Sequence, residues 1–98
     1  MIKTTSLDQI EIISNGTVQV RIALRVEDGP NILAHKWHRT ALPPETTIDL
    51  QMAAVNEHLV QMGYNPVSAS DIAKIASICS AAWTTEIISA YRLINQQA

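Results

Sequence analysis

A strict alternation of apolar and polar residues over residues 17–27 constrains the fold of this chain more than any other feature. A period of two predicts a β-strand, because successive side chains of a strand point to opposite faces. The apolar face would carry Val18, Val20, Ile22, Leu24 and Val26. The other face would carry Gln19, Arg21, Ala23, Arg25 and Glu27. Such a strand belongs in a sheet that has one buried face and one polar face.

Turn signals on both sides of this strand predict two hairpins. Asn15-Gly16 favours a type I′ turn, which would connect the strand to an Ile-rich segment at residues 7–13. The Asp-Gly-Pro-Asn cluster at residues 28–31 marks a second turn, and a third strand follows at residues 32–40. One face of that third strand would carry Leu33, His35, Trp37 and Arg39. We therefore predict a three-stranded antiparallel meander.

The second half of the chain changes to the periodicity of helices. Pro43-Pro44 would end the sheet, because proline cannot donate a hydrogen bond to a neighbouring strand. Thr46 or Thr47 would cap a first helix that stops at Gly63. The apolar stripe of this helix would contain Ile48, Met52, Val55, Leu59 and Met62.

A second helix begins at a capping-box pattern, Ser-Ala-Ser-Asp, at residues 68–71. Its apolar stripe would contain Ile72, Ile75, Ala76, Cys79, Ala82 and Trp83. Thr84-Thr85 leaves two readings open: this helix continues, or Thr84 caps a last helix over residues 85–95. We favour the break. The stripe of the last helix would contain Ile87, Ala90, Tyr91 and Ile94.

These segments predict an α+β fold, because strands and helices are segregated along the sequence. The three-stranded antiparallel β-meander would occupy about residues 6–41, and two or three α-helices would occupy about residues 47–96. A length of 98 residues is typical of one domain, so we expect a single domain over residues 1–98.

The composition points to protein partners. Hydrophobic residues make up 47% of the chain and charged residues only 16%, against about 25% charged in a typical domain. Because so little charge is left to cover the surface, we expect a homo-oligomer or another protein partner. A net charge of −2 without a basic run disfavours nucleic acid. The chain shows no signal peptide and no apolar run long enough to span a membrane, so we expect synthesis in the cytoplasm and no membrane association.

The sequence contains no motif for catalysis, a cofactor or a metal. Cys79 is the single cysteine and lies in an apolar stripe, which predicts a buried core residue. His35 and His38 would fall on opposite faces of a strand, and nothing in the sequence fixes the distance of His58. The remaining candidates, Glu45, Asp49, Asp71 and Glu86, all stand at predicted helix starts, where the helix dipole favours acids. We predict no enzyme, cofactor or metal site. Convergence of His38, His58 and an acid in one pocket would reopen the enzymatic reading.

Tryptophan and arginine mark the candidate interaction residues, because both are enriched in binding hot spots. Trp37 would pack on the core or at an interface, and Arg39 would pair with an acid on the neighbouring strand. Arg21 and Arg25 would either lie on a solvated face or pair with carboxylates of another subunit. The candidate interface residues are Arg21, Arg25, Trp37, Arg39, Trp83 and Tyr91.

Five short segments carry a resemblance to a known group of proteins. They are residues 15–21 (Asn-Gly-Thr-Val-Gln-Val-Arg), 27–29 (Glu-Asp-Gly), 37–39 (Trp-His-Arg), 42–44 (Leu-Pro-Pro) and 82–84 (Ala-Trp-Thr). Together they resemble small tailed-phage proteins that are commonly encoded near tail or fibre genes, most of which have no assigned activity. The group usually has Tyr at the position of Trp37 and often has Pro at the position of Thr85. It tends to have Gly-Asp-Asp at residues 45–47, and this chain has additional residues around 62–70.

The resemblance implies a non-enzymatic, virion-associated protein of the tail or fibre region. Such a protein would be made in the host cytoplasm, would associate with itself or with tail and fibre proteins, and would reside in the virion. The alternative hypothesis is a cytoplasmic phage assembly chaperone or regulator that binds a phage or host protein and is missing from mature particles.

Overall fold

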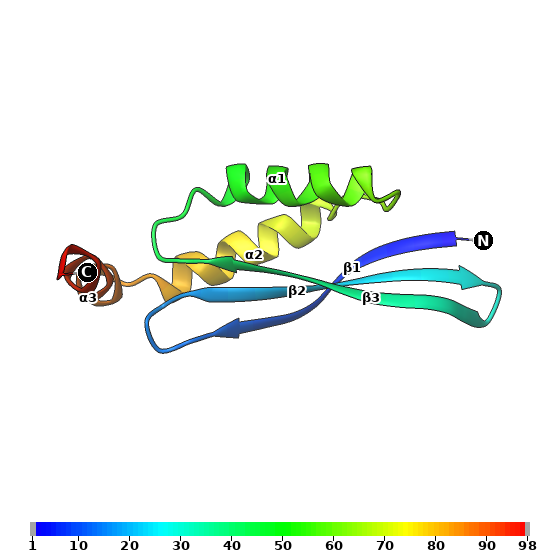
Figure 1. Cartoon of the computed structure of the whole chain (residues 1–98). Helices are drawn as coiled ribbons and strands as arrows, with labels where there is room; N and C mark the ends of the chain where they lie inside the picture. Colours follow the sequence, from blue (N-terminus) through cyan, green and yellow to red (C-terminus); the bar gives the residue numbers. More distant parts are fainter. Residues whose placement is uncertain (1, 98) are drawn as a thin grey trace.

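Three long antiparallel strands form a twisted sheet, and helices follow it in the chain (Figure 1). The computed structural model describes residues 2–97. The strands β1 (Ile2–Ile12), β2 (Val18–Asp28) and β3 (Asn31–Leu42) lie in the order β1-β2-β3. The helices are α1 (Ile48–Gln61), α2 (Ala69–Ala82) and α3 (Thr85–Gln97). This arrangement confirms the predicted α+β class. None of the helices within residues 2–97 combines the length and the apolar character needed to cross a membrane.

The first strand is longer than predicted, because β1 begins at Ile2 rather than near residue 6 or 7. Its first residues pair with the far end of β2, where Ile2 lies opposite Glu27 and Thr5 lies opposite Leu24. The segment carries lysine, threonine and serine, so it lacks the apolar alternation from which a strand is predicted. Pairing with β2 therefore decides its conformation.

The turn between β1 and β2 differs from the predicted type I′ turn. That turn needs a positive φ at both central residues, but in this loop only Gly16 has one, with φ of 92°. The Gly16 N–H donates to the Ile13 carbonyl and the Ile13 N–H donates to the Thr17 carbonyl. This pattern is the three-residue hairpin loop, in which a type I turn is followed by a glycine with positive φ. The β2–β3 turn is a two-residue loop that begins at Gly29, with φ of 58°.

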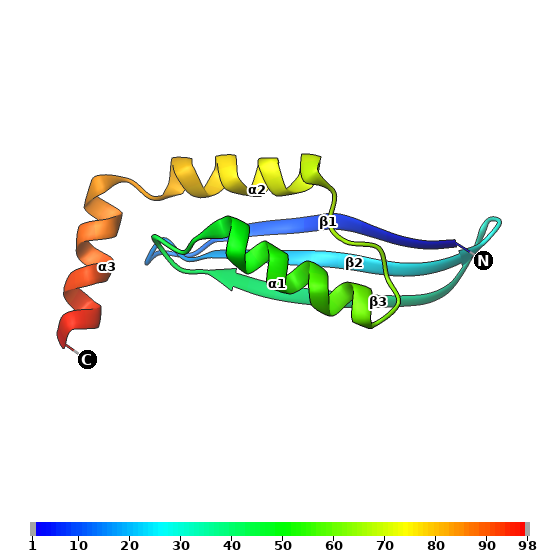
Figure 2. The same cartoon turned by 90° about the horizontal axis from the view of Figure 1, so that it is seen from above.

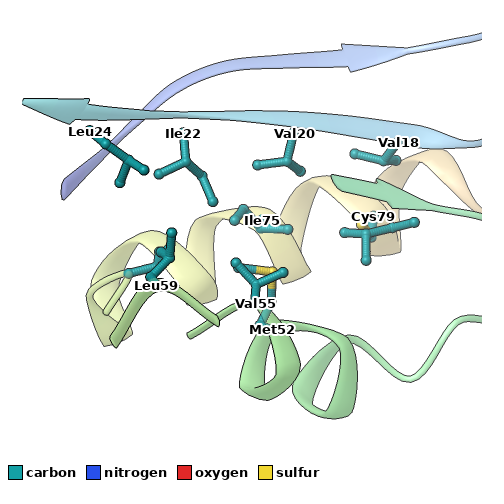
Figure 3. Packing of buried hydrophobic residues seen from close by; sticks show 11 residues of the cluster. Val18, Val20, Ile22, Leu24, Met52, Val55, Leu59, Ile75 and Cys79 are labelled. Carbon is teal, nitrogen blue, oxygen red and sulfur yellow. The ribbon is translucent and has the colours of Figure 1, made fainter. Parts of the chain in front are cut away.

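The core lies between one face of the sheet and two helices, α1 and α2, which cover that face side by side (Figures 2 and 3). The predicted apolar face of β2 is buried as expected, although Val26 is only half-buried. The buried residues are Val18, Val20, Ile22 and Leu24 of β2, Leu42 of β3, Met52, Val55 and Leu59 of α1, Val67, and Ile75 and Cys79 of α2. Burial raises the pKa of the Cys79 thiol, so this side chain stays uncharged in the core.

Local hydrogen bonds set the C-terminal end of α1 and the start of α2. At Gly63, with φ of 86°, the glycine N–H donates to the Val60 carbonyl and the Tyr64 N–H donates to the Leu59 carbonyl, which stops α1 as predicted. Thr47 is the N-cap of α1, but its side chain makes no capping hydrogen bond, so that part of the prediction is wrong. The Ser68 hydroxyl accepts the Asp71 N–H at 3.1 Å and confirms the predicted cap of α2.

The break between α2 and α3 falls at Thr84, as favoured from the sequence. Its hydroxyl oxygen accepts the Ile87 N–H at 3.2 Å, and α3 turns away at the end of the sheet (Figure 2). The Ile87 side chain lies against Gly16, and Arg92 pairs with Glu45. The hydrogen bond from Arg92 lowers the pKa of the Glu45 carboxyl. Beyond these contacts, Leu93 and Ile94 of α3 are 57% and 61% exposed.

Candidate functional site

The sheet face opposite the helices is the candidate site, and we call it the open face. Strand register and side-chain alternation place residues from all three strands on it. β1 contributes Thr4, Ser6, Asp8, Gln9 and Glu11, β2 contributes Gln19, Arg21, Ala23, Arg25 and Glu27, and β3 contributes His35, Trp37, Arg39 and Ala41. The helices α1 and α2 lie on the other side of the sheet, α3 lies at its end, and no element within residues 2–97 covers this face (Figure 1).

A cluster of aromatic and cationic side chains lies on β2 and the edge strand β3 of the open face. The Arg21 guanidinium carbon lies 4.3 Å from the centre of the Trp37 ring, and the His35 ring centre lies 4.3 Å from it. Ala23, directly across from Trp37 on β2, is fully buried. Trp37 itself keeps 40% of its surface exposed. The indole ring is therefore held by two neighbours and still available to a partner.

An ion pair fixes Arg21 in this cluster. Its Nη2 lies 2.6 Å from a carboxylate oxygen of Asp8, and its Nε donates to the same oxygen at 2.7 Å. Asp8 stands at the irregularity in β1 between Leu7 and Gln9. At the same point the Leu7 N–H donates to the Asp71 carboxylate of α2 at 3.3 Å. The bulge thus turns Asp8 towards the open face while α2 anchors the strand from the other side.

Charge on the open face is divided between the two edges of the sheet. β1 supplies the acids Asp8 and Glu11, and β3 supplies Arg39. The predicted pairing of Arg39 with a cross-strand acid is wrong, because the residue opposite it on β2 is Arg21. The Nε of Arg25 is buried and has no hydrogen-bond partner among the described residues.

A shallow hollow of about 430 Å³ lies between these charges. Its lining includes Glu11 from one edge, Arg39 from the other, and Gln19 and Arg21 between them. A hollow with an acid and a base on opposite walls suits a polar or charged side chain of another protein.

Four of the six predicted interface residues, Arg21, Arg25, Trp37 and Arg39, lie together on the open face. Trp83 and Tyr91 lie elsewhere. The Trp83 indole N–H donates to the Gly16 carbonyl at 2.7 Å, and its ring packs against the core. Tyr91 is half-buried on α3. The packing of Trp83 on the core agrees with its place in the predicted apolar stripe of the second helix, whereas its hydrogen bond to Gly16 was not predicted.

We expect Trp83→Phe to lower the free energy of unfolding by about 1 kcal/mol and to leave self-association unchanged. Phenylalanine keeps most of the ring packing but removes the donor to the part-buried Gly16 carbonyl. Urea unfolding followed by circular dichroism measures the stability, and light scattering measures the association. Unchanged stability together with weakened association would instead place Trp83 in an interface.

The structure also brings together two histidines whose distance the sequence left open. The ring centres of His38 on β3 and His58 on α1 are 5.4 Å apart. Partial burial and the neighbouring His58 lower the pKa of His38. Across residues 2–97, no His, Cys, Asp or Glu joins them to form a group of three that could hold a metal ion. Among the described residues, no acid therefore joins His38 and His58, although the enzymatic hypothesis required one. The hollow of the open face contains neither histidine.

Comparison with known proteins identified no matching family model, curated protein or solved structure.

Proposed function

We propose that the protein is a non-enzymatic component that acts through protein–protein contacts, and that its open face binds a second copy of the chain. The observation that carries this proposal is the uncovered sheet face with Trp37 held midway along its edge strand β3. A partly exposed tryptophan between an arginine and a histidine is a typical hot-spot arrangement. The low charged share of the sequence supports the same proposal.

The charges at the two edges of the open face are complementary between two copies, which favours a second copy as its partner. Two sheets facing each other across a twofold axis parallel to the strands would place β1 of each copy over β3 of the other. Glu11 shares a cross-strand row with Ala41, two residues along β3 from Arg39. The acid of one copy would therefore lie within reach of Arg39 of the other, twice in each dimer.

The size of the open face sets the expected strength of this contact. Three strands of 11 or 12 residues present an area of about 500 Å² at the usual strand spacing and rise. Standard interfaces bury about 800 Å² on each partner. We therefore expect a weak dimer, with a dissociation constant on the order of micromolar to hundreds of micromolar.

Reversal of one charge is expected to weaken this dimer strongly. Arg39→Glu would bring like charges together at both symmetric contacts, so we expect the dissociation constant to rise at least about tenfold. Glu11→Arg should do the same by opposing two bases. Combining Arg39→Glu with Glu11→Arg should restore association, because the complementary pair is rebuilt with its charges exchanged. Sedimentation or light scattering from 10 µM to 1 mM, roughly the range set by the expected affinity, measures all three variants.

Lys74→Glu supplies the matched control, since it makes the same charge change at an exposed position of α2 on the other side of the sheet. It should leave the dimer intact. A wild-type chain that stays monomeric at the highest concentration would contradict the proposed self-association, and a double variant no better than the single ones would contradict the proposed twofold arrangement.

Three of the nine acidic side chains have structural partners, which supports a non-enzymatic role for these three. Asp8 pairs with Arg21, Glu45 pairs with Arg92, and Asp71 accepts the backbone N–H of Leu7. Each has a structural partner, whereas general acid–base catalysis needs carboxyl groups that converge on a substrate pocket.

We also propose a location in the virion, supported by the resemblance of the sequence to small tailed-phage proteins. Mass spectrometry of purified particles of the encoding phage tests this part. Presence of the protein at defined stoichiometry in mature particles supports a virion component. Its presence in assembly intermediates alone would favour the assembly chaperone.

A further inference from the structure

The pairing of His38 with His58 joins the edge strand of the sheet to a helix. His38 lies on the helix-covered face of β3, since it stands opposite Ile22 of β2. His58 stands near the end of α1, directly before the buried Leu59 that seats this helix on the sheet. Figure 2 shows α1 lying along β3 and β2. The packing of α1 thus brings together two imidazole rings that are 20 positions apart (38 and 58) in the sequence.

The separation of the rings fits two ligands of one metal ion. Zinc binds imidazole nitrogen at about 2.0–2.1 Å in tetrahedral geometry. The ring centre lies about 1.1 Å behind the nitrogen, so two rings on one tetrahedral ion have centres about 5.2 Å apart. The observed distance is 5.4 Å. The angle of 38° between the ring planes is compatible, because each ring can rotate about its metal–nitrogen bond without moving its centre.

The surroundings leave room for the remaining ligands. His38 is half-buried and His58 is exposed, so water can reach the ion and complete its coordination. The neighbouring Thr40 on the same face of β3 accepts a hydrogen bond from the Gln51 side chain, so it is already engaged. Imidazole nitrogen selects zinc, nickel and copper rather than calcium or magnesium, which prefer oxygen ligands.

We propose that His38 and His58 bind a divalent transition-metal ion and thereby clamp α1 to β3. Two protein ligands are half the number in a structural zinc site, so we expect a dissociation constant on the order of 10 µM. An ion that binds only the folded chain raises its stability. At about 100 times the dissociation constant, this linkage should raise the melting temperature by about 10–20 °C in a domain of this size.

Thermal unfolding of tag-free full-length protein tests the clamp. Melting is followed by circular dichroism without metal, with NiCl₂ or ZnCl₂ at roughly 1 mM, and with MgCl₂ at the same concentration. Nickel or zinc should raise the melting temperature, a chelator should reverse the rise, and magnesium should have no effect. Calorimetric titration with nickel should give one site per chain.

Histidine variants distinguish the clamp from binding elsewhere. His58→Ala changes an exposed side chain, so the variant should fold and should lose the metal-induced rise. His35→Ala is the matched control, because the third histidine lies on the open face beside Trp37, and it should keep the rise. Absence of a rise in the wild-type chain, or an equal rise in His58→Ala, would overturn the proposal. Since the pair lies on the face opposite the one proposed to self-associate, either result leaves the dimer test unaffected.

Discussion

Replacing Gly16 with alanine is expected to lower the free energy of unfolding by about 2–5 kcal/mol, as measured by urea unfolding. Two effects add at this position. The backbone has φ of 92°, where a Cβ is strained by about 1–2 kcal/mol. That Cβ would also collide with Cγ2 of Ile87 on α3, and such overpacking typically costs a further 1–3 kcal/mol.

Gly29→Ala separates these two effects. Gly29 also has a positive φ, 58°, but an added Cβ would meet nothing within 4 Å. We expect this control to cost only the backbone strain of about 1 kcal/mol. The double variant Gly16→Ala with Ile87→Ala should recover part of the overpacking loss, since the two sites are in contact. Equal losses for Gly16→Ala and Gly29→Ala would show that α3 is not seated on this turn.

Sequence reasoning predicted the elements whose signals are local. The alternation over residues 17–27 placed four aliphatic side chains of β2 in the core, because strand geometry alone decides which face each one takes. The Ser68 cap and the Gly63 stop were predicted for the same reason: each depends on backbone groups within one helical turn. The break at Thr84 belongs to this class as well.

Features that depend on register and packing could not be predicted. The sequence placed Arg39 on the same face as Trp37, but only the register of β2 with β3 sets Arg21 opposite it. The ion pair of Asp8 with Arg21 needs a bulge that no residue pattern in β1 signals. The first residues of β1 are polar and take strand conformation only by pairing with β2.

The candidate site contains features of both kinds, those that the sequence predicts and those that it does not. Arg21, Arg25, Trp37 and Arg39 were selected as residue types that suit an interface, and strand alternation brings them to one face. The distribution of acids on β1 and a base on β3, from which the twofold arrangement is proposed, follows from strand order. The His38–His58 pair depends on how α1 is seated on the sheet, so its two members gave no joint signal in the sequence.

Leu59→Ala is expected to lower the free energy of unfolding by about 3 kcal/mol. The side chain is fully buried among residues of the sheet and of α1 and α2 (Figure 3), and truncation removes its apolar contacts and leaves a cavity. Domains of this size are stable by about 5–15 kcal/mol, so the loss is a large share of the total. The melting temperature should fall by about 10–20 °C in calorimetry or circular dichroism.

Val60→Ala is the matched control, because Val60 follows Leu59 on the same helix but is 56% exposed. Both changes shorten an aliphatic side chain, and both replace it with a good helix former, so burial is the main difference between them. We expect the control to change stability by less than about 0.5 kcal/mol. Similar losses at the two positions would contradict the packing of α1 on the sheet. That packing also sets the distance between His58 and His38, so the same result would remove the geometric basis of the proposed metal clamp.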